Sequence, residues 1–157
     1  MINGHATPDR TKKFAERHTE IPQQNYKNVH KLTLSNVGIG TYLGNPDVAT
    51  DKLVEDAVKK SVLGGINVID TAINYRAQKA ERSVGNAISQ LIDNDDISRE
   101  EIFVSTKNGY VTNDGDIKED LMQYVMREYG KTGIVKEGDI SPGYHCMTLP
   151  YLNDQLE

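Results

Sequence analysis

Three short apolar runs of this chain each end in polar side chains that could take part in chemistry. The run NVGIG is followed by Thr41 and Tyr42, the run INVI by Asp70, and the run IFVST by Lys107. Helical patterns separate these runs, and strands that alternate with helices form a parallel sheet whose carboxyl ends meet at one edge. The sequence therefore predicts an α/β fold with its reactive groups gathered at that edge.

Two stretches between the runs have the spacing of amphipathic helices. The first should begin with Thr50 as its N-cap and end at Gly64 and Gly65, with inward-facing residues Leu53, Val54, Ala57, Val58 and Val62. The second should begin at about Lys79, with inward-facing residues Ala80, Val84, Ala87, Ile88 and Leu91. The chain contains three strand–helix periods of roughly 35 residues. The length of one period is close to one-eighth of the ~250 residues that a (β/α)8 barrel needs.

The N-terminal segment, residues 1–30, is polar and has few apolar anchors. We expect a short helix there at best, and otherwise a mobile arm. From Lys31 the alternating KLTL leads into NVGIGTY, so this stretch is interpreted as the first strand of the sheet. Its glycines would lie where a crowded interior or a nearby ligand excludes side chains.

Beyond Lys107 the repeat breaks down. Apolar residues four positions apart predict a helix that stops at Gly130: Ile117, Leu121, Val125 and Tyr129. Residues 131–144 are rich in glycine, and Thr148 is expected to cap a last helix that runs to Glu157 with Leu152 and Leu156 facing inward. Three open strands leave edges and apolar faces uncovered, so we interpret the chain as the N-terminal part of a larger barrel.

The composition of the chain argues against several classes of partner and site. A net charge of −5 without any block of lysine and arginine argues against nucleic acid or an anionic membrane as a partner. Cys146 is the only cysteine and the histidines have no partners at metal-ligand spacing, so we expect neither a disulfide nor a metal site. Without a long apolar stretch or a signal peptide, the expected location is the cytoplasm and the expected partner a small molecule.

Asp70, Tyr75 and Lys107 make chemical sense together if a carbonyl group is to be reduced. The carbonyl oxygen then needs a proton donor, and a free tyrosine, with a pKa of about 10, gives up its proton more easily beside an ammonium ion. Tyr75 would be the acid, Lys107 the ammonium ion and Asp70 its anchor. From spacing alone, Asp70 could instead cap a turn, Tyr75 could pack against its neighbours, and Lys107 could be a solvated strand end or the Schiff-base lysine of an aldolase.

The motifs themselves resemble those of a known family. VGIGTYLG, IDTAINYRAQKAERSVGNAI and EIFVSTKNGY, in this order, look like the N-terminal half of the aldo-keto reductase family. The likeness covers residues 31–110, and HCMTLPYLNDQLE resembles the stretch that leads into that family's fourth helix. The resemblance implies a parallel (β/α)8 TIM barrel, of which residues 31–157 would form the first three to four βα units. The polar arm of residues 1–30 would precede these units, which would contain a long loop or insert at about 111–147.

The same resemblance implies an NAD(P)H-dependent oxidoreductase that reduces aldehydes or ketones to alcohols. The cofactor, usually NADPH, would bind in an extended form without a GxGxxG fingerprint. Carried over by position, Tyr75 is the proton donor, and Lys107 and Asp70 support it. The positions near the nicotinamide ribose are those of Thr41, Tyr42, Asp70 and Thr71.

Some parts of the family pattern are not found in this sequence. The family's catalytic histidine ends a fourth strand, whereas His145 lies in a loop, so we do not assign it a catalytic role. The loops that hold the cofactor's phosphates are also absent, so a C-terminal half is expected in the full-length protein. Two alternatives remain: a non-catalytic, cofactor-binding regulatory relative, and an inactive fragment. The segment 112–144 could be a lid or a substrate-side loop, and the N-terminal arm could seal the barrel bottom or contact another subunit.

Overall fold

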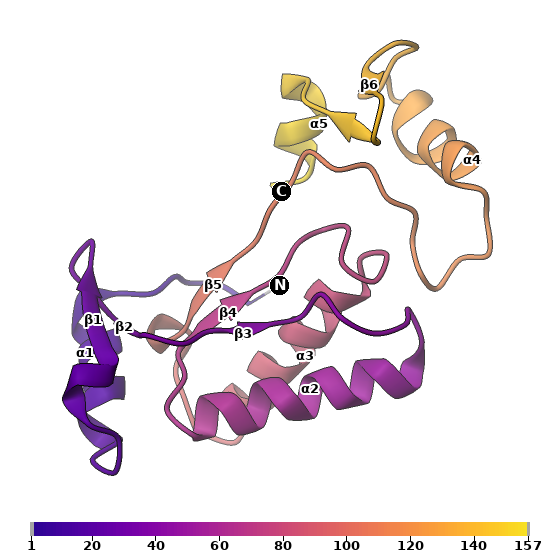
Figure 1. Ribbon diagram of the computed structural model, residues 1–157. Helices are drawn as coiled ribbons and strands as arrows, with labels where there is room; N and C mark the ends of the chain where they lie inside the picture. Colours follow the sequence, from indigo (N-terminus) through magenta and orange to yellow (C-terminus); the bar gives the residue numbers. More distant parts are fainter. Residues whose placement is uncertain (1, 157) are drawn as a thin grey trace.

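A parallel three-stranded sheet forms the centre of the chain. The computed structural model describes residues 2–156. Strands β3 (Ile39–Gly40), β4 (Val68–Asp70) and β5 (Phe103–Ser105) lie in the order β3-β4-β5. The connecting helices α2 (Val48–Leu63) and α3 (Lys79–Asp93) both lie on one side of this sheet (Figure 1). The predicted α/β class is therefore confirmed, and residues 2–156 form no closed barrel.

The register of the three strands decides which side chains meet the helices. Ile69 pairs with Ile39 and Val104, and all three belong to the apolar core beneath the sheet. Side chains alternate between the two faces of a strand, so the next row, which includes Asp70 and its partner Ser105, points away from the helices. This alternation sets Asp70 on the open face, at the carboxyl end of its strand.

The two helices match the prediction to different degrees. Helix α3 begins at Lys79 as predicted, and its five expected inward residues are all buried. The N-cap of α2 is Asp47, whose carboxylate accepts a hydrogen bond of 2.7 Å from the Thr50 amide, so the prediction of Thr50 as the cap was wrong. The prediction that Leu53 and Ala57 face inward was wrong. Both are exposed, Leu53 at 71%, because the buried stripe of α2, which packs against α3, consists of Val58 and Val62.

The N-terminal segment, residues 2–30, contains the short helix that was expected, whereas the alternative of a mobile arm is wrong because a turn and a hairpin strand follow the helix. Helix α1 (Pro8–Arg17) buries Phe14 completely, and the 3-10 turn η1 (Gln23–Asn25) leads to an antiparallel hairpin of β1 (Tyr26–Val29) and β2 (Leu32–Ser35). The KLTL run thus belongs to this hairpin and not to the first parallel strand. Figure 1 shows α1 and the hairpin at the end of the sheet where its strands begin.

Asn67, immediately before β4, joins the hairpin to the sheet. Its side-chain carbonyl accepts from the Ser35 amide at 2.9 Å, and its side-chain amide donates to the Thr33 carbonyl at 2.9 Å. The same amide donates to the carbonyl of Glu101 at 3.3 Å, in the 3-10 turn η2 (Arg99–Glu101). Asn67 is fully buried, and a buried amide is stable only when its polar atoms are paired in this way.

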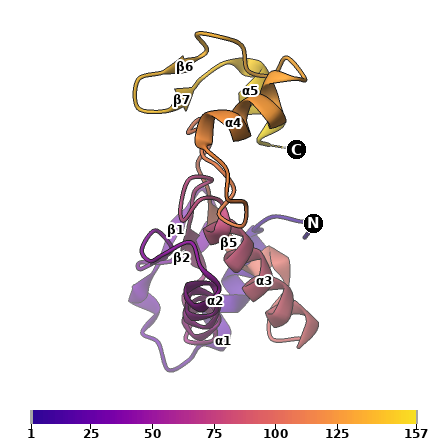
Figure 2. The ribbon, with the colours of Figure 1, turned by 90° about the vertical axis from the view of Figure 1, so that its right-hand side faces the viewer.

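The chain after β5 forms a second, smaller apolar cluster. Helix α4 (Leu121–Val125) continues as the π-helix η3 (Met126–Gly130), followed by a hairpin of β6 (Ile140–Ser141) and β7 (His145–Cys146) and by helix α5 (Leu149–Asp154). Figure 2 shows these elements gathered apart from the sheet and its helices. Their shared core contains Val111, Tyr124, Val125, Val135, Cys146 and Tyr151.

Three details of this region correct the predictions. Ile117 lies before α4 and outside it, so the predicted helix is shorter at its start. Helix α5 ends at Asp154, and Glu157 lies outside the described residues. Tyr151 is the buried residue of α5, whereas Leu156 is 75% exposed, because the helix turns its tyrosine toward the cluster.

Candidate active site

Asp70, Tyr75 and Lys107 lie together at the carboxyl end of the sheet. Asp70 is the last residue of β4, Lys107 follows β5 by two residues, and Tyr75 lies in the loop between β4 and α3. The Lys107 ammonium donates to both carboxylate oxygens of Asp70, at 2.7 and 2.8 Å, and to the Tyr75 hydroxyl at 3.1 Å. Asp70 and Tyr75, which both lie more than 30 residues before Lys107 in the sequence, thus converge on its side-chain nitrogen.

The environment keeps Lys107 charged. Burial alone would lower the pKa of its ammonium group, but hydrogen bonds to Asp70 and Tyr75 outweigh this effect and raise that pKa. The carbonyl of Thr71 accepts a further hydrogen bond from the same nitrogen at 2.9 Å. The nitrogen also lies 4.8 Å from the centroid of the Tyr75 ring, within the range of a cation–π contact. A fixed positive charge therefore lies beside the Tyr75 hydroxyl.

The four residues expected near a ribose differ in accessibility. Tyr42 is 63% exposed, and its ring packs edge-on against that of Tyr75, with 5.0 Å between the centroids. The Asp70 side chain is 44% exposed. Thr41 is buried and its hydroxyl donates to the Asp70 carbonyl at 3.1 Å, and Thr71 is buried with no partner for its hydroxyl. Only Asp70 and Tyr42 therefore present side-chain surface to a ligand at this edge.

The carboxylate of Glu81, which was not assigned a role, lies beside the same cavity as Lys107. The Thr106 hydroxyl donates a short hydrogen bond to Glu81, in the first turn of α3. Glu81, Thr106 and Lys107 line a cavity of about 280 Å³ together with Asn108. The sequence contained a signal for Glu81, since a glutamate follows Tyr75 within the second motif, but nothing in that motif indicated its contact with Thr106.

None of the four histidines forms part of this site. His145, in β7, is exposed and packs edge-on against Tyr110, with 5.1 Å between the ring centroids. His18 pairs with Glu20 at 3.1 Å, near the other end of the sheet. Within residues 2–156, no histidine makes a hydrogen bond to Tyr75 or Lys107. His145 was expected to lie in a loop, and its position in the strand β7 corrects that expectation.

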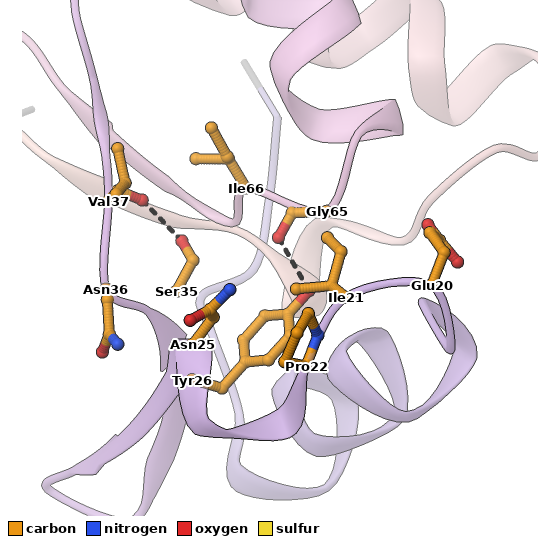
Figure 3. Close-up of a pocket in the computed structure, with 10 residues that line it drawn as sticks. All are labelled: Glu20, Ile21, Pro22, Asn25, Tyr26, Ser35, Asn36, Val37, Gly65 and Ile66. Atoms are coloured by element: carbon orange, nitrogen blue, oxygen red, sulfur yellow. Dashed lines mark hydrogen bonds between the residues drawn. The ribbon is translucent and has the colours of Figure 1, made fainter.

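A separate cavity of about 420 Å³ lies where the strands begin. It is lined mainly by apolar side chains between the N-terminal hairpin and the loop before β4, including Ile21, Pro22, Tyr26, Val37 and Ile66 (Figure 3). The Tyr26 hydroxyl points across it and donates to the Gly65 carbonyl at 2.8 Å. Ligands of parallel α/β sheets bind at the carboxyl ends of the strands, so this cavity is not the candidate active site.

A protein-family model matches the part of the chain that contains the candidate active site. The model of the aldo/keto reductase family matches residues 36–136, which is 101 of the 157 residues (136 − 36 + 1). The matched range runs from the residues before β3 to those after η3 and includes Asp70, Tyr75 and Lys107. Within residues 2–156, no helix is both long enough and apolar enough to cross a membrane.

Proposed function

Because the chain belongs to the aldo/keto reductase family, we propose that it carries part of the active site of a nicotinamide-dependent oxidoreductase. The proposed reaction is the reduction of an aldehyde or ketone, as the small-molecule substrate, to an alcohol. One observation supports it above all others: the Lys107 ammonium contacts the Asp70 carboxylate and the Tyr75 hydroxyl at the same time.

In the proposed reaction Tyr75 is the proton donor. As negative charge develops on the carbonyl oxygen, the Tyr75 hydroxyl transfers its proton to that oxygen, and the Lys107 charge stabilises the phenolate left behind. Asp70 holds the ammonium in place with two hydrogen bonds. A positioned acid of this kind contributes about 10²- to 10⁴-fold to a rate.

The exposed residues of the site fit a nicotinamide cofactor, which we propose to be NADPH. When bound, the cofactor supplies the hydride. Asp70 would accept a hydrogen bond from a ribose hydroxyl, because a carboxylate has about four acceptor positions and Lys107 uses two of them. The exposed Tyr42 ring would contact the ribose beside it. Thr41 and Thr71, both buried, would shape the backbone beneath the site.

We also propose that β3, β4 and β5 are the first three strands of a (β/α)8 barrel. Their consecutive order, their parallel direction and the position of α2 and α3 on one side of the sheet support this assignment. Further strands would then supply the catalytic histidine and the groups that hold the cofactor's phosphates.

An aldolase that uses Lys107 as a Schiff base is less well supported. A lysine must lose its proton before its nitrogen can attack a carbonyl, and such lysines have a lowered pKa. The pKa of Lys107 is raised by its bonds to Asp70 and Tyr75. A non-catalytic regulatory relative would bind the cofactor but show no turnover on aldehydes.

The test is the Tyr75→Phe variant, which removes the hydroxyl but keeps the ring. In the full-length protein, oxidation of NADPH in the presence of an aldehyde should fall by about 10²-fold or more. Tyr144→Phe is the matched control, because Tyr144 lies in the β6–β7 hairpin, is 50% exposed and, within residues 2–156, makes no hydrogen bond to the Lys107 nitrogen. If Tyr75→Phe retained the wild-type rate, Tyr75 would not be the proton donor.

A further inference from the structure

The backbone directly after Tyr75 is strained. Arg76, Ala77 and Gln78 have φ angles of 49°, 52° and 70°, so three successive residues with side chains adopt a left-handed conformation. Such conformations are unfavourable for residues with a Cβ atom, and they persist only where the surrounding structure enforces them. Because this left-handed turn connects Tyr75 to α3, whatever enforces the turn also positions Tyr75.

A buried ion pair holds the first residue of the turn. The Arg76 side chain is 1% exposed and donates to the Asp51 carboxylate of α2 at 3.0 Å. It also donates to the Ser83 hydroxyl of α3 at 2.8 Å. A buried guanidinium group needs such partners, and both of them lie on the rigid helices beneath the sheet.

A second set of contacts comes from residues 113–117, which we call the strap. The Gly115 amide donates to the carbonyl of Ala77, in the middle of the left-handed turn, at 2.9 Å. Asp116 pairs at 2.5 Å with Lys79, which is 6% exposed and which also contacts Asp51 at 2.8 Å. Asp114 and Asp116 both accept hydrogen bonds from Arg82, at 2.6 to 2.8 Å. The strap is therefore fixed to the first turns of α3 by charge.

The strap also packs closely against its neighbours, in addition to its ion pairs. A Cβ atom at Gly115 would lie 2.7 Å from Cδ of Lys79 and 3.1 Å from Cβ of Pro46, so a glycine is required for this approach. The neighbouring residues Tyr110 and Thr112 line a cavity of about 470 Å³, whose other walls include Tyr42 and Pro46. The strap thus connects the turn after Tyr75 to one wall of a cavity at the candidate active site.

We propose that Asp114 and Asp116 are positioning residues for the proton donor. Through Lys79, Arg82 and the Ala77 carbonyl, the strap keeps the left-handed turn in place and so keeps Tyr75 against Lys107. This inference rests on the proposed function for its catalytic consequence. Its structural part, the fixing of the turn by the strap, does not depend on that function.

The structural part is tested by hydrogen–deuterium exchange in the Asp114→Asn/Asp116→Asn double variant. We expect at least roughly tenfold faster exchange at the amides of Gly115, Gln78 and Ala80, because Arg82 and the buried Lys79 lose charged partners. Glu119→Gln is the matched control, since Glu119 follows the strap by two residues and pairs with Arg127 at 2.8 Å. Exchange within about twofold of wild type in the double variant would overturn the proposal.

The catalytic part is tested by steady-state kinetics with NADPH and an aldehyde. The double variant should lower kcat by roughly tenfold or more with a smaller change in KM, and Asp116→Glu should retain most of the rate. A change in KM alone, or no rescue by glutamate, would contradict a positioning role. If the full-length wild-type protein showed no turnover, the proposed function would fail, whereas the exchange experiment would still decide whether the strap fixes the turn.

Discussion

Replacement of Asn67 by alanine should separate the N-terminal hairpin from the sheet. The side chain makes three hydrogen bonds to backbone groups of Ser35, Thr33 and Glu101, which come from two segments, the strand β2 and the turn η2. Alanine would leave those groups without a partner in a site that is fully buried. A buried polar group without a hydrogen bond costs about 1 to 3 kcal/mol.

Two of the three bonds are 2.9 Å long and the third is 3.3 Å, so the third should contribute less. Partial relaxation and entry of water reduce the sum. We therefore expect Asn67→Ala to lower the free energy of unfolding by about 2 to 4 kcal/mol, in the upper range for single substitutions.

Urea unfolding followed by circular dichroism measures this loss as a lower midpoint at an unchanged slope. Asn36→Ala is the matched control, because Asn36 is an exposed asparagine next to the hairpin and donates one hydrogen bond, to the Gln24 carbonyl. It should cost less than about 1 kcal/mol. If both variants lost the same small amount, Asn67 would not join the hairpin to the sheet.

Two further predictions concern stability. Gly65→Ala should lower the free energy of unfolding by about 1 to 3 kcal/mol, because Gly65 has a φ of +89° and a Cβ atom there would lie 2.2 Å from Cδ1 of Ile21; an unchanged melting temperature would contradict this. Acid should release the strap: hydrogen bonds from Arg82 and Lys79 hold the pKa values of Asp114 and Asp116 below the usual 3.8. The ionised carboxylates of Asp114 and Asp116 therefore stabilise the strap fully above about pH 4. This stabilisation is lost as the pH falls through their lowered pKa values. Hydrogen exchange at the Gly115 amide, corrected for the intrinsic pH dependence of exchange, should accelerate only below about pH 4, and acceleration already at pH 6 would refute this explanation.

The parts of the fold that the sequence predicted correctly are those that depend on local patterns. Helix α3 and the strand ends at Asp70 and Lys107 could be predicted because spacing along the chain determines burial, and parallel strands bring their ends together. The burial of Phe14 could not be predicted in this way, because the strand and turn that cover α1 come later in the chain. Periodicity likewise could not decide whether Tyr151 or Leu152 faces the C-terminal cluster.

In the candidate site, too, some residues could be predicted from the sequence and others could not. Asp70, Tyr75 and Lys107 stood out because each follows a strand-like run or belongs to a motif. The strap could not be recognised in the sequence, because Lys79 and Asp116 are separated by 37 residues and each alone resembles an ordinary surface charge. Only the folded chain shows that these charges meet beside the proton-donor candidate.

The central claim is that Lys107 acts on the reaction through Tyr75. We would measure kcat for NADPH-dependent aldehyde reduction in Tyr75→Phe, Lys107→Met and the double variant. If the two residues act as a unit, the double variant should be no slower than the slower single variant, because either change alone removes the assisted proton transfer. If the two losses multiplied, Lys107 and Tyr75 would act independently, and the proposed proton donor would be wrong.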